Sequence, residues 1–165
     1  RDRAKDEEKA NRIWLGRKSA FGAMGQIADY MCLDGTIPVN KLPYVLKCIG
    51  EMSKTYGLSV ANVFHAGDGN MHPLILYDAN KPGELTKCEE FGAEILRLCV
   101  EVGGCLTGEH GVGIEKRELM DYQFTTDDID AQLRIKDVFD SKWLLNPLKV
   151  FPLHHTEARR MAYNF

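Results

Sequence analysis

The spacing of apolar residues predicts two amphipathic helices in the middle of the chain. Over residues 41–56 and again over 84–102, apolar side chains recur at steps of three and four. This spacing gathers them on one face of a helix, which must then be buried against another layer. Asn40 is the predicted N-cap of the first helix, and Thr126 caps a last one. Weaker patterns predict the remaining helices at 3–20, about 114–122 and 127–144.

Alternating, valine-rich segments predict a β-hairpin between these two helices. Residues 58–65 and 71–78 read as its strands, and the glycine-rich stretch 66–70 reads as the turn. Further short strands are expected after Asp34 and at 105–107. Helices that alternate with a few antiparallel strands indicate an α+β fold. We expect a ferredoxin-like antiparallel sheet with helices packed on one face, followed by C-terminal helices.

Composition and charge exclude several classes of protein. The 165 residues suit a single folded domain, and the net charge of −3 offers no basic surface for nucleic acid. No apolar run is long enough to cross a bilayer, and the charged N-terminus does not resemble a signal peptide. The five cysteines are odd in number and include no C-x-x-C pair. This pattern favours reduced, buried thiols in a cytoplasmic protein.

The predicted hairpin carries a histidine in each strand. If it is symmetric about Asp68 and Gly69, His65 lies directly opposite His72, with Cβ atoms about 4.5–5.5 Å apart. Two imidazoles at this distance can bind one metal ion. The alternative is a pair of histidines at a sheet edge with no ligand.

A second candidate lies in a glycine-rich loop, where Glu109 precedes His110. The carboxylate can serve as a third metal ligand and the imidazole as a general base. A plain connection with a capping glutamate is the alternative. The Arg17 guanidinium can bind the carboxylate of an acidic substrate. The alternative is that Arg17 is a solvent-exposed residue at the end of a helix. His154 and His155 stand in a polar tail, where surface histidines are more common than ligands. No phosphate-binding loop, dinucleotide fingerprint, zincin motif or serine-hydrolase elbow is present.

Several segments together resemble the C-terminal half of the FAD-linked oxidases of the vanillyl-alcohol oxidase superfamily. The most similar branch contains the bacterial glycolate oxidases and the D-lactate dehydrogenases. The resemblance runs from about residue 11 to residue 152, and the two histidine-bearing segments carry most of its specificity. The matching segments are Gly16–Phe21, Asp34–Pro38, His65–Asp78, Gly108–Gly113 and Asn146–Pro152.

The resemblance implies oxidation of a 2-hydroxy acid, glycolate or D-lactate, to the 2-keto acid with hydride transfer to FAD. It also implies a divalent metal, zinc or manganese, held by His65, His72 and Glu109. His110 would be the base that takes the hydroxyl proton, and Arg17 would pair with the substrate carboxylate. Asn146 would lie close to the flavin.

The resemblance further implies how the chain is organised. Residues 1–145 would form the substrate and metal domain, and 146–165 a tail that returns to an FAD domain. That domain would lie N-terminal to this chain and bind most of the FAD. We therefore expect a fragment that is inactive alone. Other glycolate oxidase subunits, one of them an iron–sulfur subunit, are the expected partners, with a cytoplasmic or peripheral inner-membrane location. A stand-alone metal-binding module and a metal-dependent hydrolase or lyase remain alternatives.

Overall fold

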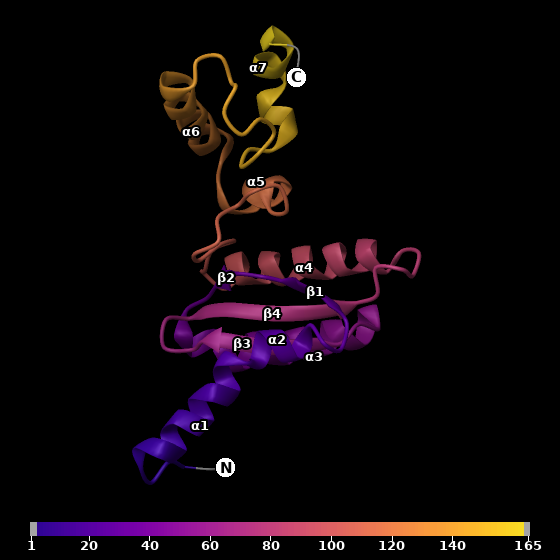
Figure 1. The fold of residues 1–165 in the computed structure, drawn as a ribbon. Helices are drawn as coiled ribbons and strands as arrows, with labels where there is room; N and C mark the ends of the chain where they lie inside the picture. The colour runs from indigo at the N-terminus through magenta and orange to yellow at the C-terminus, as the bar shows by residue number, and fades with distance from the viewer. Residues whose placement is uncertain (1–2, 164–165) are drawn as a thin grey trace.

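A computed structural model describes residues 3–163 of the protein (Figure 1). The outermost residues of the predicted 1–145 domain and 146–165 tail, namely 1–2 and 164–165, lie outside the described residues. The strands are β1 (Asp29–Cys32), β2 (Gly35–Thr36), β3 (Val60–His65) and β4 (Asn70–Tyr77). The main helices are α1 (Glu7–Lys18), α2 (Ala20–Met24), α3 (Leu42–Tyr56), α4 (Glu84–Glu101), α5 (Met120–Gln123), α6 (Thr126–Phe139) and α7 (Glu157–Tyr163).

The four named strands form one antiparallel sheet around β4. On one side β4 pairs with β3, and on its other side it pairs with β1 and then with β2. Cys32 is opposite Leu74 and Gly35 is opposite Met71, so β1 and β2 share one register. They therefore act as a single strand that is interrupted between Cys32 and Gly35. Strand β1 was not predicted from the sequence.

The strand order confirms the predicted α+β class and matches a ferredoxin-like sheet. After α4, Cys105 forms an antiparallel bridge with Thr36 of β2. The spatial order is therefore Cys105, β1 and β2, β4, β3, which is the order of a split β-α-β arrangement. The predicted strand at 105–107 is reduced to this bridge. Its next backbone N–H, at Leu106, donates to the Gln123 side chain instead of continuing the ladder.

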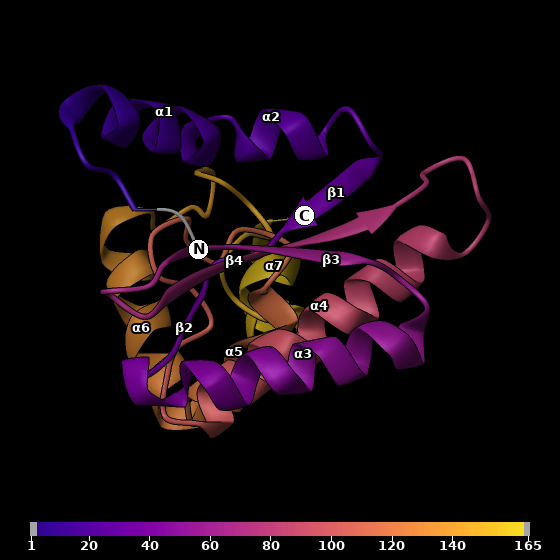
Figure 2. The ribbon, with the colours of Figure 1, turned by 90° about the horizontal axis from the view of Figure 1, so that it is seen from below.

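The two predicted amphipathic helices cover one face of the sheet. Figure 2 shows α3 and α4 side by side on that face and α1 with α2 on the other. Val45 and Ile49 of α3 are fully buried, as are Phe91 of α4 and Ile75 of β4. The periodicity therefore identified the core correctly. The N-terminal helices, in contrast, lie across the sheet from α3 and α4.

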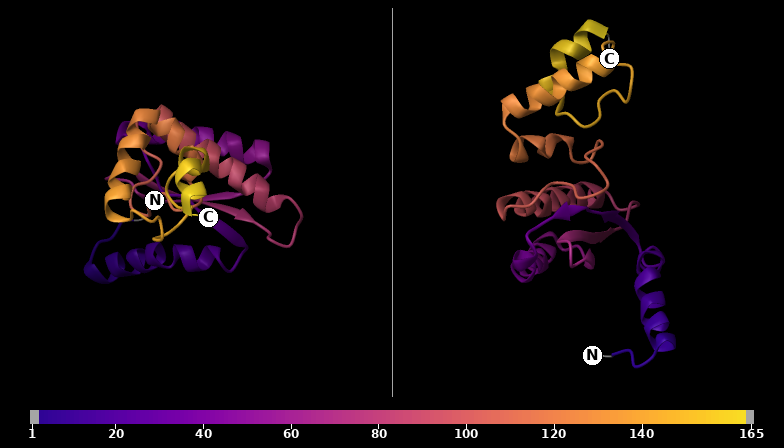
Figure 3. Two further views of the ribbon diagram at one scale, coloured as in Figure 1. Left: turned by 90° about the horizontal axis from the view of Figure 1, so that it is seen from above. Right: turned by 90° about the vertical axis from the view of Figure 1, so that its left-hand side faces the viewer.

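The C-terminal helices extend beyond α4, away from the sheet (Figures 1 and 3). The last predicted helix, 127–144, is shorter than expected, because α6 ends at Phe139. The Asp140 carboxylate accepts hydrogen bonds from the N–H groups of Leu144 and Leu145, which a continuing helix would have used. Trp143 adopts a left-handed φ of 55°, which is incompatible with a right-handed helix. The residue is also buried. The predicted helix at 114–122 is likewise reduced to a 3-10 turn and α5.

Both predicted caps were displaced. Thr125, not Thr126, caps α6, in a capping box with Asp128. Asn40 lies inside a 3-10 turn, and α3 begins after Lys41 without a side-chain cap. Pro43 in the first turn of α3 has no N–H, so one of the donors that a cap would satisfy is missing.

No helix in the described part of the chain is both long enough and apolar enough to cross a membrane.

Candidate active site

The β3–β4 hairpin brings its two histidines to one face, in a register that differs from the prediction. His65 is opposite Asn70, and His72 is opposite Val63. The direct His65–His72 pairing was therefore wrong. The shift is an even number of residues, so both side chains still point to the same face. Their rings lie 5.5 Å apart, edge to face.

The loop that joins the two strands, residues 66–69, is one residue shorter than the predicted turn at 66–70. Gly69 is the last residue of this loop. Its carbonyl accepts a hydrogen bond from the N–H of Ile37, which follows β2. Gly69 therefore pairs with the segment on the β2 side of β4 and not with β3, its hairpin partner. Its φ of 73° and the approach of Ile37 leave no room for a side chain, because a Cβ would meet the Ile37 carbonyl oxygen. This non-local contact therefore requires glycine at the end of the hairpin loop.

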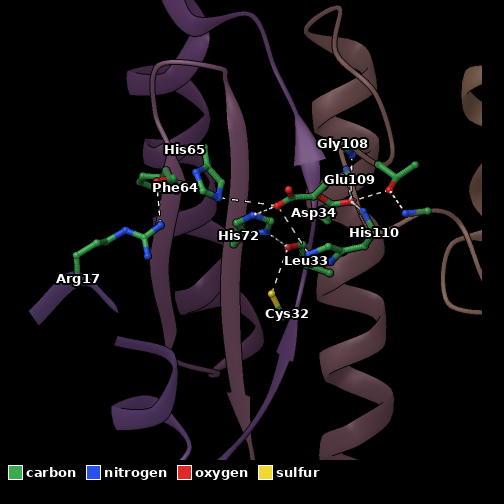
Figure 4. Close-up of polar contacts among 12 residues, drawn as sticks. Arg17, Cys32, Leu33, Asp34, Phe64, His65, His72, Gly108, Glu109 and His110 are labelled. Carbon is green, nitrogen blue, oxygen red and sulfur yellow. Dashed lines mark hydrogen bonds and ion pairs between the residues drawn. The ribbon is translucent and has the colours of Figure 1, made fainter. Parts of the chain in front are cut away.

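His72 is the best-fixed imidazole of the site. Only 3% of the residue is exposed, and its Nδ1 lies 3.0 Å from the Leu33 carbonyl oxygen. A carbonyl oxygen only accepts, so Nδ1 donates and Nε2 is left facing the site. Nε2 lies 2.8 Å from Oε1 of Glu109 (Figure 4). Phe21 of α2 contacts the same ring edge to face, at 6.3 Å.

Three imidazoles converge on one carboxylate oxygen. Nε2 of His65 and Nε2 of His110 each lie 3.9 Å from Oε1 of Glu109, and His72 lies closer. The His110 ring stacks on His72 at 5.0 Å. The structure thus brings together His65, His72, Glu109 and His110 from two distant segments. Because His65 and His110 are equally far from Oε1, distance alone does not separate a ligand from a base.

Asp34, in the interruption between β1 and β2, organises the loop that carries Glu109 and His110. Its fully buried carboxylate accepts hydrogen bonds from the Thr107 hydroxyl and from the N–H groups of Gly108, Glu109 and His110. Burial by itself would raise the pKa of Asp34. These hydrogen bonds and a nearby ammonium group outweigh burial and hold that pKa well below its usual range.

The ammonium group belongs to Lys116, whose Nζ lies 3.3 Å from Asp34 and 3.1 Å from the Thr107 hydroxyl. Both charged groups are nearly or fully buried. Neither residue was a candidate from the sequence, since nothing in their local pattern indicates a buried ion pair. One signal was available for Asp34: it begins one of the segments that carried the family resemblance.

The donor set of the site fits a divalent metal ion. With Nδ1 of His72 donating to Leu33, Nε2 of a neutral ring directs a lone pair at the Glu109 carboxylate. Two acceptors 2.8 Å apart repel unless a proton or a cation lies between them. Imidazole nitrogen with carboxylate oxygen is a ligand combination that zinc and neighbouring transition metals accept.

Two neighbouring groups suit this role less well. The Asp34 carboxylate lies near the cluster, but its lone pairs are already used by the loop N–H groups. Burial, followed by the negative charge of Asp34, raises the pKa of Cys32 to about 11. Its thiol therefore stays protonated, whereas metals bind the thiolate. His72, Glu109 and His110 present donor atoms within 4.8 Å of one another and could hold a metal. His65 belongs to no such group among the described residues, although its Nε2 lies 3.9 Å from Oε1 of Glu109.

Arg17 and Asn146 lie near different parts of this cluster. Arg17, half-buried at the end of α1, donates from Nη2 to the Phe64 carbonyl at 3.3 Å, next to His65 (Figure 4). A pocket of about 400 Å³ opens beside His110 and extends to Lys149. Lys149 donates to Oδ1 of Asn146 at 3.1 Å. Asn146 is thus near the far wall of the pocket, and no contact joins it or Arg17 to Glu109 among the described residues.

Residues 1–150 match the family described as "FAD linked oxidases, C-terminal domain". The chain belongs to this family. The resemblance seen in the sequence is therefore confirmed, and the matched region includes every candidate site residue.

Curated relatives carry the names of oxidoreductases. The chain is 56% identical to "Glycolate oxidase subunit GlcD" of Escherichia coli K12 over 153 residues, 92% of this chain and 31% of that protein. It is 35% identical to the protein of the same name from Bacillus subtilis, over 90% of this chain and 32% of the relative. "Probable D-lactate dehydrogenase, mitochondrial" of Danio rerio is 29% identical, over 95% of this chain and 32% of the relative. The chain thus spans about a third of the length of these relatives.

Proposed function

We propose that this chain is the substrate- and metal-binding half of an FAD-dependent 2-hydroxy-acid dehydrogenase that acts on glycolate or D-lactate. The observation that carries the proposal is the convergence of His65, His72 and His110 on one Glu109 oxygen, in a family of FAD-linked oxidases. When bound, FAD would accept the hydride, and a divalent metal would lower the pKa of the substrate hydroxyl.

In this proposal each side chain of the chain has one task. His65, His72 and Glu109 hold the metal, zinc or manganese. His110 takes the hydroxyl proton on Nε2 as hydride leaves the adjacent carbon. Its position supports this role, because it lines the open pocket beside the cluster. Arg17 binds the substrate carboxylate through its guanidinium, which is held by the Phe64 carbonyl.

The rest of the proposal concerns the whole protein. Residues 146–165 would return to the FAD domain, with Asn146 close to the flavin. The name "glycolate oxidase subunit" of the relatives suggests partner subunits, and an iron–sulfur subunit is one of those we propose. We keep a cytoplasmic location, with peripheral attachment to the inner membrane through partners, as part of the proposal.

The proposed metal ligand His72 and the proposed base His110 can be distinguished in the full-length enzyme. Dye reduction with glycolate and with D-lactate and the bound metal should be measured for His72→Ala and His110→Gln. His72→Ala should lose both metal and turnover. His110→Gln should keep the metal and lose about 10²–10⁴-fold in turnover, the usual contribution of a general base.

Asp68→Asn is the matched control, because Asp68 is exposed in the same hairpin loop. It should keep both metal and turnover. The role assignment is wrong if His110→Gln loses the metal and still turns over. The proposal fails altogether if the wild-type enzyme reduces no dye with any 2-hydroxy acid, which would favour a hydrolase, a lyase or a metal-binding module.

The isolated chain offers an independent test of the division between two halves. It should bind one metal ion at this cluster but little flavin, and it should be inactive. A flavin absorbance spectrum with stoichiometric FAD in the purified 165-residue chain would contradict the division.

A further inference from the structure

A second group of metal-binding side chains lies outside the candidate active site, between α5 and the C-terminal segment. Nε2 of His155 is 2.7 Å from Oδ1 of Asp121, and Nε2 of His154 is 3.2 Å from Oδ2 of the same carboxylate. One donor atom from each of the three residues lies within 4.8 Å of the other two. Asp121 belongs to α5, and the histidines belong to the 3-10 helix Leu153–Thr156.

The convergence of two adjacent histidines is unusual for this backbone. Successive side chains of a 3-10 helix point about 120° apart, because it has three residues per turn. Here the two ring centroids lie 4.3 Å apart, and each ring contacts a different oxygen of the Asp121 carboxylate.

The surrounding structure holds this arrangement in place. Pro152 and Thr156, on either side of the histidines, are buried. The Thr156 hydroxyl donates to the Leu153 carbonyl. The side chain of His155 is only 12% exposed, so its direction is set by packing. Asp121 follows the buried Met120 in α5.

The distances are close to those of a tetrahedral metal site. Ligands at about 2.0–2.2 Å from such a metal lie about 3.3 Å from one another. The two nitrogen–oxygen distances, 2.7 and 3.2 Å, are shorter than this by about 0.6 and about 0.1 Å, so binding requires only small side-chain shifts. More than half of the His154 side chain is exposed, which leaves an open side for water as a fourth ligand.

The ligand types select the class of metal. Two imidazoles and one carboxylate suit zinc and other late transition metals, whereas calcium and magnesium prefer oxygen ligands alone. We propose that Asp121, His154 and His155 form a second site for a transition metal of the zinc class. A metal there fastens the C-terminal segment 153–156 to α5. The inference does not depend on the proposed function, because the two sites share no residue.

Zinc titration of the metal-free full chain by calorimetry, with metal content after dialysis, tests the site. The wild type should bind two equivalents. The double variant His154→Gln, His155→Gln should lose one equivalent. The variant His72→Ala should lose the other, and combining all three substitutions should abolish binding. Far-UV circular dichroism of each variant checks that it is folded.

The outcomes separate the two sites. If the His154→Gln, His155→Gln protein still binds the wild-type number of zinc ions, the second site does not exist and the three side chains form only a hydrogen-bonded cluster. If His72→Ala has no effect while the double variant loses one equivalent, the second site stands and the active-site assignment fails. Asp121→Asn adds a check that keeps the size of the side chain, since it should weaken the second site alone at least about tenfold.

Discussion

The buried pair of Asp34 and Lys116 makes a quantitative prediction. Asp34→Asn keeps the shape of the side chain but removes its negative charge. It also replaces one acceptor oxygen with an NH2 group, which is itself a donor, among the N–H groups of residues 108–110. Lys116 is then left as an uncompensated charge at 4% exposure. Breaking a buried ion pair in this way costs about 3–5 kcal/mol. In a domain of this size the melting temperature should fall by about 6–20 °C.

The same substitution should also loosen the loop that carries Glu109 and His110, because one neutral amide oxygen replaces the charged carboxylate that accepts from three backbone N–H groups. The affinity for the proposed metal should fall about 10–100-fold, the usual effect of losing a group that orients ligands. Urea denaturation gives the free energy of unfolding, and zinc calorimetry gives the affinity. Asp130→Asn, at an exposed position of α6, is the matched control and should change neither.

The pH dependence of this effect follows from the lowered pKa of Asp34. A carboxyl whose pKa is lower in the folded than in the unfolded state stabilises the fold fully above the unfolded value, about 3.9, and loses this contribution as pH falls below it. The difference between wild type and Asp34→Asn should therefore be constant from pH 5 to 8 and shrink below about pH 4.

A double-mutant cycle with Lys116→Met tests the reasoning directly. Lys116→Met should cost less in the Asp34→Asn background than in the wild type, because the charge it removes is already uncompensated there. Additive effects of the two substitutions, or an Asp34→Asn protein as stable as the wild type, would refute the account of the pair.

Three further predictions concern positions outside this pair. Gly69→Ala should destabilise the protein by more than about 1 kcal/mol in urea denaturation, whereas Gly67→Ala, which has open space around it and no positive φ, should not. Thr125→Ala should cost about 1 kcal/mol by the same measurement, because it removes the capping box of α6, and an unchanged stability would contradict that role. The exposed Cys105 should react with iodoacetamide at pH 8 in the folded protein. Burial raises the pKa of Cys99 to about 12, so mass spectrometry should find that thiol unmodified until the protein is unfolded.

Local patterns were enough to predict the elements that bury a regularly spaced apolar face. The apolar stripes of α3 and α4 and the alternation of the hairpin strands were read correctly, and Val45, Ile49 and Phe91 are core residues. The predictions failed where a distant group competes for the backbone. Asp140 ends α6 early by capturing N–H groups, and Gln123 draws Leu106 away from a strand.

The sequence was sufficient to indicate the family of this protein and the residue types of the candidate site. The residue types at 65, 72, 109 and 110 and their glycine-rich surroundings indicated a histidine–carboxylate site, and the family resemblance was confirmed. The meeting of those residues depends on long-range contacts. Ile37 donates a hydrogen bond to Gly69 at the end of the hairpin loop, and Asp34 holds the 107–110 loop against the sheet. Such contacts join segments dozens of residues apart, and burial gives them their strength. A local pattern contains neither the contact partner nor its burial. Only the tertiary structure therefore reveals the roles of Asp34 and Lys116 and the cluster around Asp121.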